Sequence, residues 1–284
     1  MKNAVILAAG TASRFVPLSE TMPKGLLEVR GEILLERQIR QLKEAGVEDI
    51  FVVVGYKAPL FGYLARKFGV RLVMNEDYGR YNNISSVIRI LDCLDETYLS
   101  CSDLYFTDNV FLEEPSASYY ALQYAEGETR EWCVREDVSG RIREVTVGGN
   151  DAWYMAGHVF FDAAFSARFK PLLQEAYQDE RARQGYWEDV LIRHLDELPI
   201  HGRHYGRDAV REFDTLDDLR AFDGTYLDDT RSPIIRDICA ALHCRERELS
   251  RFMPVQPSES LCFTFEYDTR TYRYDGWDGS VRPM

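Results

Sequence analysis

Two positive side chains stand in a stretch of small residues near the start of this 284-residue chain. The segment VILAAGTASRFVPLSETMPKGLL (5–27) carries Arg14 and Lys24 after an apolar run that ends at Gly10. Residues without bulk let a ligand approach the backbone closely, and backbone N–H groups at the end of a strand can bind phosphate oxygens. The two cations would then neutralise the charge of a phosphorylated ligand. A tight turn with solvated cations is the alternative that the local pattern leaves open.

Carboxylates follow two later predicted strands. Asp103 ends the segment TYLSCSD (97–103), and Asp214 lies near the end of VREFDT (210–215). Glu212, two residues before Asp214, lies on the same face of that strand because side chains alternate along a strand. Carboxylate oxygens are ligands that Mg²⁺ prefers. Each acid by itself is equally consistent with a turn or a helix cap.

Composition limits the classes of protein to consider. The formal net charge of −13 argues against binding to a nucleic-acid backbone, and 45% apolar residues suffice for a packed core. The six cysteines form no C-x-x-C pair, which favours free thiols in a reducing cytoplasm. No apolar run has the length of a membrane span, and the first residues do not resemble a signal peptide. The sequence predicts a cytoplasmic protein and leaves its oligomeric state open, including a homodimer.

The elements that must position these residues alternate between strand and helix over the first hundred residues. This order predicts an α/β fold, a Rossmann-like, mainly parallel sheet flanked by helices. Gly46 marks the end of the first predicted helix. Strands are expected at 4–9, 49–56, 70–75 and 97–103, and helices at 33–45, 58–68 and 84–95.

The middle of the chain changes character. Residues 131–137, 141–149 and 152–162 read as antiparallel strands that extend the sheet and wall a pocket. A long amphipathic helix is expected over about 163–184. Thr215 and Asp218 resemble a capping box at the start of a later helix.

The segment after residue 228 reads as a linker, which divides the chain into a domain at 1–228 and a C-terminal α+β extension at 229–284. A helix at 233–243 and two short strands, SLCFTFEY and TYRYDGW, are expected in the extension. It is too small for an independent core.

The complete string L-A-A-G-x-x-x-R-x-x-P-x-x-x-x-x-P-K-x-L resembles the signature of the sugar-phosphate nucleotidylyltransferase superfamily. Members usually have glycine where this chain has Ala12, so alanine is unfavourable if the position requires positive φ. Residues 1–226 are most similar to the bacterial CTP:phosphocholine cytidylyltransferases. The similar segments are RLVMNEDYGRYNNISS (71–86), YLSCSDLYF (98–106), REWCV (130–134), GYWEDV (185–190) and REFDT (211–215).

This resemblance implies an enzyme that joins CTP and phosphocholine into CDP-choline and pyrophosphate, with Mg²⁺ as cofactor. It assigns Lys24 and Arg14 to the phosphates and the catalytic step. It assigns Asp103 and Asp214 to the metal, and Glu212, on the same strand face as Asp214, is the candidate third acid. The nucleotide is expected to contact the first loop and the segment YNNISS, through Leu7, Ala8, Ala9, Gly10, Thr11, Ala12, Asn82, Asn83 and Ser85.

The expected acceptor site is aromatic with one acid. A quaternary ammonium has no N–H donor and is bound by aromatic faces and negative charge. The residues assigned to it are Trp132, Tyr154, Tyr186, Trp187 and Glu188, with Trp153 as a further candidate. Each aromatic residue alone is as consistent with core packing. Glu188 would equally suit the primary ammonium of phosphoethanolamine or 2-aminoethylphosphonate. A sugar 1-phosphate acceptor and a catalytically silent binding module are further alternatives.

The extension faintly resembles the start of choline/ethanolamine kinase-like phosphotransferases. The Gly-Gly-x-Thr-Asn turn of those proteins is replaced by PVQPSES (254–260), and no kinase catalytic loop follows. Kinase activity is therefore not expected, and docking of the extension onto the transferase or a partner subunit is the favoured interpretation.

Overall fold

The computed structural model describes residues 2–255 and 261–284, so most of the segment PVQPSES lies outside the described residues. The described residues group into two compact units. The first unit contains the chain up to Gly10 together with Leu34–Arg211, and the second contains Thr11–Ile33 and Glu212–Met284. The loop with Arg14 and Lys24 thus belongs to the same unit as the extension. The expected domain boundary at residue 228 stays a prediction.

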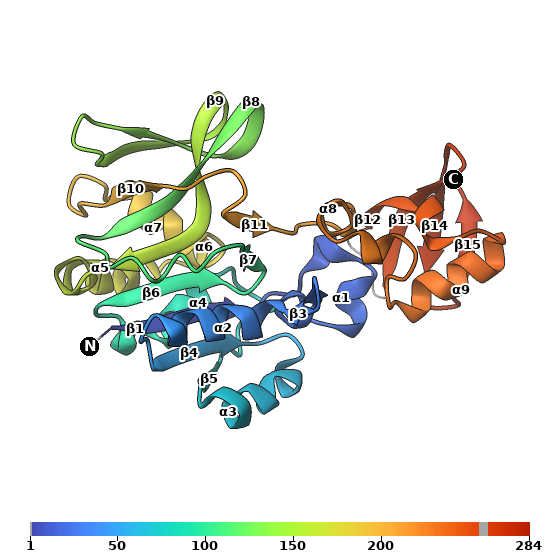
Figure 1. Cartoon of the computed structure of the whole chain (residues 1–284), viewed down its shortest axis with the longest axis horizontal. Coiled ribbons are helices and arrows are strands. Elements are labelled where there is room, and N and C mark those ends of the chain that lie inside the picture. Colours follow the sequence, from blue (N-terminus) through green and yellow to red (C-terminus); the bar gives the residue numbers. More distant parts are fainter. Residues whose placement is uncertain (1, 256–260) are drawn as a thin grey trace. The chain divides into compact units, whose positions relative to one another are not determined.

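Within its described residues, the first unit is built on a seven-stranded sheet with the order β10-β8-β9-β6-β1-β4-β5 (Figure 1). Strands β6, β1, β4 and β5 run parallel, and β9 is antiparallel to both β6 and β8. This confirms the predicted mainly parallel α/β sheet. The strands are β1(Asn3–Ala8), β4(Asp49–Val54), β5(Arg71–Met74), β6(Thr97–Cys101), β8(Tyr119–Glu136), β9(Ile142–Phe161) and β10(His201–His204).

Helices pack against this sheet. Inward residues of β1, such as Val5 and Leu7, share one apolar cluster with residues of α4, α5 and α7. Helix α2 packs against β6, where the Ser100 hydroxyl donates a hydrogen bond to Gln38 Oε1 at 3.0 Å. The remaining elements are α2(Leu34–Glu44), η3(Ala58–Phe61), α3(Gly62–Phe68), α4(Ile84–Arg89), η4(Leu91–Cys93), β7(Leu104–Phe106), α5(Ala163–Ala176), α6(Glu180–Arg183) and α7(Trp187–Arg193), the η elements being 3₁₀-helices.

Three boundaries in the first unit differ from the sequence prediction. The helix predicted at 163–184 is wrong in length, because α5 ends at Ala176 and the Asp179 side chain caps α6 by accepting from Arg181 N–H. In place of the three strands predicted at 131–162, the structure has two long strands, β8 and β9, and β8 begins earlier, at Tyr119. The first five residues of β8 are all buried and the later ones alternate in exposure, so no single hydrophobic period predicts the whole strand. Helix α4 ends at Arg89 and is followed by η4.

The second unit contains the first loop, the helix after Asp214 and the extension. Its described extension forms an antiparallel sheet of four strands, and the two central strands and the helix agree with the sequence prediction. The elements are η1(Ser13–Phe15), α1(Leu18–Thr21), η2(Lys24–Leu26), β2(Glu28–Val29), β3(Glu32–Ile33), α8(Leu216–Phe222), η5(Gly224–Leu227), α9(Pro233–Leu242), η6(Glu246–Glu248), β12(Ser250–Pro254), β13(Cys262–Tyr267), β14(Arg270–Asp275) and β15(Ser280–Pro283). Strand β11(Val210–Glu212) crosses the division between the units.

Arg220, a residue of α8, forms hydrogen bonds with the extension. Its buried guanidinium donates hydrogen bonds to the carbonyl oxygens of Tyr226, Glu246 and Leu249 at 3.1, 2.9 and 2.5 Å. Arg231 lies 3.4 Å from the Glu28 carboxylate and so links the extension to the first loop. The extension therefore packs against other residues of the second unit, and its docking onto the transferase or a partner subunit stays a prediction. All six cysteines are free, as predicted, and no helix in the described ranges is long and apolar enough to cross a membrane.

Candidate active site

The end of β1 is fixed in a tightly packed position. Leu7, Ala8 and Ala9 are buried, and the Ala9 carbonyl accepts a hydrogen bond from Tyr56 N–H at 3.0 Å. Gly10 is exposed, and a Cβ atom placed on it would meet nothing within 4 Å. Packing among the described residues therefore does not require glycine there, whereas a ligand that approaches the backbone would.

Ala12 adopts a left-handed backbone conformation, with φ 50° and ψ 44°. It lies next to exposed Thr11 and immediately before η1. Left-handed geometry places Cβ close to the following carbonyl oxygen and costs an alanine roughly 1–2 kcal/mol. The position therefore has positive φ, which makes glycine the better residue, and this chain carries the strain.

Arg14, Lys24 and Asp214 meet in the second unit. Arg14 Nη2 lies 2.9 Å and Lys24 Nζ 3.3 Å from Asp214 Oδ1. The Arg14 side chain is 67% exposed, whereas that of Lys24 is 11% exposed and lies over the Phe15 ring at 5.6 Å. Lys24 and Asp214 are 190 residues apart in the sequence, and the fold brings them into contact at one carboxylate oxygen. The group can hold a negatively charged ligand if Asp214 gives up part of its contact with the cations.

The start of α8 orients Asp214. Thr215 and Asp218 form the predicted capping box: the Thr215 hydroxyl accepts from Asp218 N–H at 3.2 Å, and Asp218 Oδ2 accepts from Thr215 N–H at 2.8 Å. These bonds fix the residue that follows Asp214, because they satisfy N–H groups that the helix leaves unpaired.

The predicted metal ligands lie in both units. Asp103 is in the turn after β6 in the first unit, whereas exposed Glu212 and half-buried Asp214 are in the second. The donors are all carboxylate oxygens, which suit a hard cation such as Mg²⁺. Among the described residues, no group of three or more His, Cys, Asp or Glu side chains is arranged to hold a metal ion. The magnesium site stays a prediction.

The segment YNNISS is held by internal hydrogen bonds. Buried Ser85 donates to the Asn82 carbonyl at 2.7 Å and accepts from Asn75 Nδ2 at 2.9 Å. Asn83 Oδ1 accepts from Trp187 N–H at 2.9 Å, and its Nδ2 donates to Glu188 Oε2 at 3.2 Å. The structure gives Ser85 and Asn83 structural partners, and the expected contact of this segment with a nucleotide stays a prediction.

The predicted aromatic residues separate into two groups. Trp132 and Tyr186 form an edge-to-face pair with ring centroids 5.5 Å apart, and Tyr186 is 46% exposed. Trp187 is 2% exposed, stacks on Tyr120 and packs edge-on against Phe161. Trp187 therefore has a packing role in the core, and its expected contact with an acceptor stays untested.

Two further aromatic candidates come from β9. The Tyr154 hydroxyl donates to Gln123 Oε1 at 3.4 Å, and Trp153 stacks on His204 with centroids 4.1 Å apart. Both side chains are partly exposed on β9, which pairs with β8 along most of its length.

Glu188 is a buried carboxylate with neutral partners. Its Oε1 accepts from the Tyr120 hydroxyl at 3.3 Å and its Oε2 from Asn83. The pKa of Glu188 is raised to about 7, mainly by burial and to a smaller extent by the negative charge of Asp189, while hydrogen bonds from its own backbone N–H, Asn83 and Tyr120 partly oppose the rise. A cation placed next to it would favour the charged form. The sequence did not point to Tyr120, because it stands 68 residues before Glu188 in the first part of β8, which was not predicted as a strand.

The start of α7 depends on a close approach at Gly185. Asp189 Oδ2 accepts from Tyr186 N–H at 2.7 Å, and a Cβ atom on Gly185 would lie 2.7 Å from that same oxygen. Gly185 and Asp189 together define where the helix begins, which places Tyr186 at the N-cap and Glu188 in the first turn.

Comparisons with known proteins agree with this fold. The family model for the MobA-like NTP transferase domain matches residues 4–196. A 2-aminoethylphosphonate cytidylyltransferase from Lancefieldella rimae is 36% identical over 229 residues, which cover 79% of this chain and 93% of that protein. A choline-phosphate cytidylyltransferase from Streptococcus pneumoniae is 32% identical, covering 77% of this chain and 95% of the relative.

A solved structure gives the same result. The CTP:phosphocholine cytidylyltransferase from Streptococcus pneumoniae superposes with a TM-score of 0.76 at 31% identity, over 79% of this chain and 98% of the other. The family match ends at residue 196, so it does not reach Asp214 or the extension. The chain belongs to the MobA-like NTP transferase family and is a nucleotidyltransferase of the cytidylyltransferase kind.

Proposed function

We propose that this enzyme transfers the cytidylyl group of CTP to phosphocholine, forming CDP-choline and pyrophosphate. The observation that carries the choice of acceptor is the Trp132–Tyr186 ring pair, which stays partly exposed at the start of the helix that holds Glu188. A trimethylammonium group gains about 0.5–2 kcal/mol from a well-placed aromatic face, and a buried carboxylate adds negative charge.

A phosphate oxygen of the acceptor attacks the α-phosphorus of CTP, a new P–O bond forms, and the bond to the departing pyrophosphate breaks. No protein nucleophile is needed, so the side chains contribute position and charge. Lys24, which is largely buried, suits the transferring phosphate, and the more exposed Arg14 suits the β- and γ-phosphates. The backbone from Ala9 to Ala12 binds the remaining phosphate oxygens.

Asp103, Asp214 and Glu212 are the residues proposed to hold Mg²⁺. When bound, the ion would supply charge to the phosphate groups and help to align them. The support is the chemistry of the donors, since hard cations take oxygen ligands.

A second acceptor, 2-aminoethylphosphonate, is favoured by a separate observation. Trp187 is packed into the core, where it has a packing role, and the buried Glu188 supplies an acid that would suit a primary ammonium. The relative from Lancefieldella rimae is named for this acceptor.

Pyrophosphate release separates the two acceptors. The purified protein is assayed with CTP and Mg²⁺ and with phosphocholine, phosphoethanolamine, 2-aminoethylphosphonate or glucose 1-phosphate in turn. We expect the highest kcat/KM with phosphocholine, and a Trp132→Ala variant should raise its KM several-fold. A preference for 2-aminoethylphosphonate, together with a larger effect of Glu188→Gln than of Trp132→Ala, would replace phosphocholine with the second candidate. Activity with glucose 1-phosphate alone would refute both.

A further inference from the structure

Asn83 connects the segment assigned to the nucleotide with the helix that carries the acid for the acceptor. Its carbonyl oxygen accepts from Trp187 N–H and its amide nitrogen donates to Glu188. A side-chain amide has one oxygen and one NH₂ group. Both ends of Asn83 are therefore engaged by the first two residues of α7.

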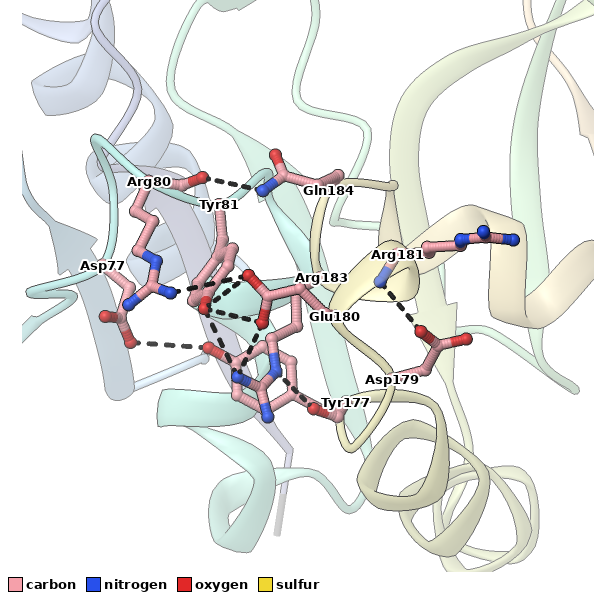
Figure 2. A network of polar contacts seen from close by, with 9 residues as sticks. All are labelled: Asp77, Arg80, Tyr81, Tyr177, Asp179, Glu180, Arg181, Arg183 and Gln184. Carbon is pink, nitrogen blue, oxygen red and sulfur yellow. Dashed lines mark hydrogen bonds and ion pairs between the residues drawn. The ribbon is translucent and has the colours of Figure 1, made fainter.

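A set of side chains holds the chain around Asn83. We call Tyr81, Tyr177, Glu180 and Arg183 the Arg183 clasp, and Figure 2 shows its contacts. Arg183 Nε donates to the Tyr177 carbonyl at 2.7 Å, and its Nη1 lies 3.3 Å from both the Tyr81 hydroxyl and Glu180 Oε2. The Tyr81 hydroxyl also donates to Glu180 at 3.1 Å. The clasp joins the loop before α4 to the connection that runs from α5 to α7.

The clasp reaches Asn83 through the backbone. Asn82 N–H donates to the Arg183 carbonyl at 3.0 Å, and Asn82 Oδ1 accepts from Asn83 N–H at 2.8 Å. Gln184 Nε2 donates to the Arg80 carbonyl at 3.2 Å and adds a second link between the same segments (Figure 2). The backbone of Asn83 is thus fixed from the same connection that leads into α7.

We propose that Asn83 is a positioning residue that orients the Glu188 carboxylate toward the cationic amine of the acceptor, held in place by the Arg183 clasp. This inference rests on the proposed function, in which Glu188 meets the amine. Each polar group of the Asn83 side chain already has one protein partner in α7, and the expected contact of Asn83 with the cytosine base stays a prediction.

The surroundings of Glu188 define what a change at Asn83 would do. Tyr120 donates to Glu188 from β8, and Asp189 is the neighbouring charge on α7 itself. Loss of the Asn83 donor would leave the Tyr120 hydroxyl and the backbone N–H of Glu188 itself as neutral donors to the carboxylate. Amine binding that needs ionised Glu188 would then shift to higher pH, because hydrogen bonds to the charged form lower its pKa.

Asn83→Asp separates the two roles of the side chain. The new carboxylate can still accept from Trp187 N–H and cap α7, but it places a second acid where an amide donated to Glu188. Gln178→Glu is the matched control: it makes the same amide-to-acid change at an exposed residue whose side chain donates to the Gln174 carbonyl. We expect Asn83→Asp to raise the acceptor KM about tenfold, the loss of one hydrogen bond to a charged group, with the CTP KM changed less than about twofold.

A readout independent of turnover is the ¹³C NMR titration of Glu188. Its midpoint should rise by about one pH unit in Asn83→Asp, since a like charge disfavours ionisation, and should be unchanged in Gln178→Glu. If Asn83→Asp does not fold, Tyr81→Phe takes its place. This variant removes the hydroxyl that Glu180 and Arg183 bind, and should raise the acceptor KM two- to threefold, roughly the loss of one neutral hydrogen bond.

The outcomes separate the inference from the proposed function. An increased KM for CTP with an unchanged KM for the acceptor would assign Asn83 to the nucleotide and overturn the inference. An unchanged Glu188 midpoint would overturn the link between the two side chains. A wild-type protein that releases pyrophosphate with no amine-containing acceptor would refute the proposed function instead, while the titration would still test the contact between Asn83 and Glu188.

Discussion

Asp214 and Glu188 are carboxylates in different units with opposite surroundings. Asp214 is partly exposed and bound by two cations, whereas Glu188 is buried and bound by an amide and a hydroxyl. Asp214 therefore has its charge compensated inside the protein, and any phosphate ligand bound by Arg14 and Lys24 would compete with Asp214 for these cations. Glu188 lacks such compensation in the contacts described here, which makes a cationic ligand favourable. The difference shows that two carboxylates of one chain can have very different charge surroundings, and it supports the proposal that the first region binds phosphates and the second a cationic group.

The largest expected effect comes from removing a cation next to Asp214. Lys24→Ala should lower kcat by orders of magnitude, ~3 kcal/mol or more, because charge that develops on the phosphates loses its partner. Turnover is measured by pyrophosphate release, with Lys43→Ala as control because Lys43 pairs with an exposed glutamate. Near-normal kcat in folded Lys24→Ala would remove Lys24 from the phosphate site.

Asp214→Asn tests the same region from its acidic side. We expect a loss of about a hundredfold in kcat, the size seen when one charge-stabilising group is removed, together with a weakened response to Mg²⁺. Mg²⁺ titrations of activity provide the measurement, and Asp237→Asn, an exposed acid of the same unit, provides the control. A variant with full rate at low Mg²⁺ would show that Asp214 is not a ligand.

Glu188→Gln should affect stability in a pH-dependent way. The pKa of Glu188 is raised from 4.5 to about 7, so its stabilising contribution is complete below pH 4.5 and is lost as pH rises through 7. The variant should be less stable than wild type by about 1 kcal/mol near pH 4, because the new amide places a donor opposite the donors of Asn83 and Tyr120 at every pH. At pH 8 it should be more stable than wild type by about 2 kcal/mol, because wild type must then keep a buried charge or a proton that costs stability. Denaturant melts at both pH values measure it; equal differences at the two values would contradict the raised pKa.

The smallest effect is expected at Ala12. Ala12→Gly should stabilise the protein by about 1 kcal/mol, because glycine adopts the left-handed conformation without a Cβ penalty. Ala176→Gly, at the last residue of α5, serves as contrast and should be neutral or destabilising. Thermal melts at one pH compare the two. A destabilised Ala12→Gly would indicate that the loop does not need positive φ at this position.

Local patterns in the sequence predicted the repeating elements well. Buried β-branched runs gave the parallel strands β1 and β4, and the spacing of Leu35, Ile39 and Leu42 gave the buried face of α2. The capping box at Thr215 was also local, since its four residues contain all the groups that bond. Such features follow from periods of 2 and 3.6 residues and from short-range hydrogen bonds.

The sequence alone also determined which residue types gather in the two candidate regions and that Ala12 departs from the usual glycine. Only the tertiary structure decided how they are used. It brought Asp214 into contact with Arg14 and Lys24, which lie about 190 residues earlier in the sequence. It placed Trp187 in the core while Tyr186 stayed exposed, and it brought Asn83 and Tyr120 within hydrogen-bonding distance of Glu188. Neighbouring residues on a helix differ in burial according to what packs against each side. Contacts between distant segments depend on the whole fold, so no local pattern specifies them.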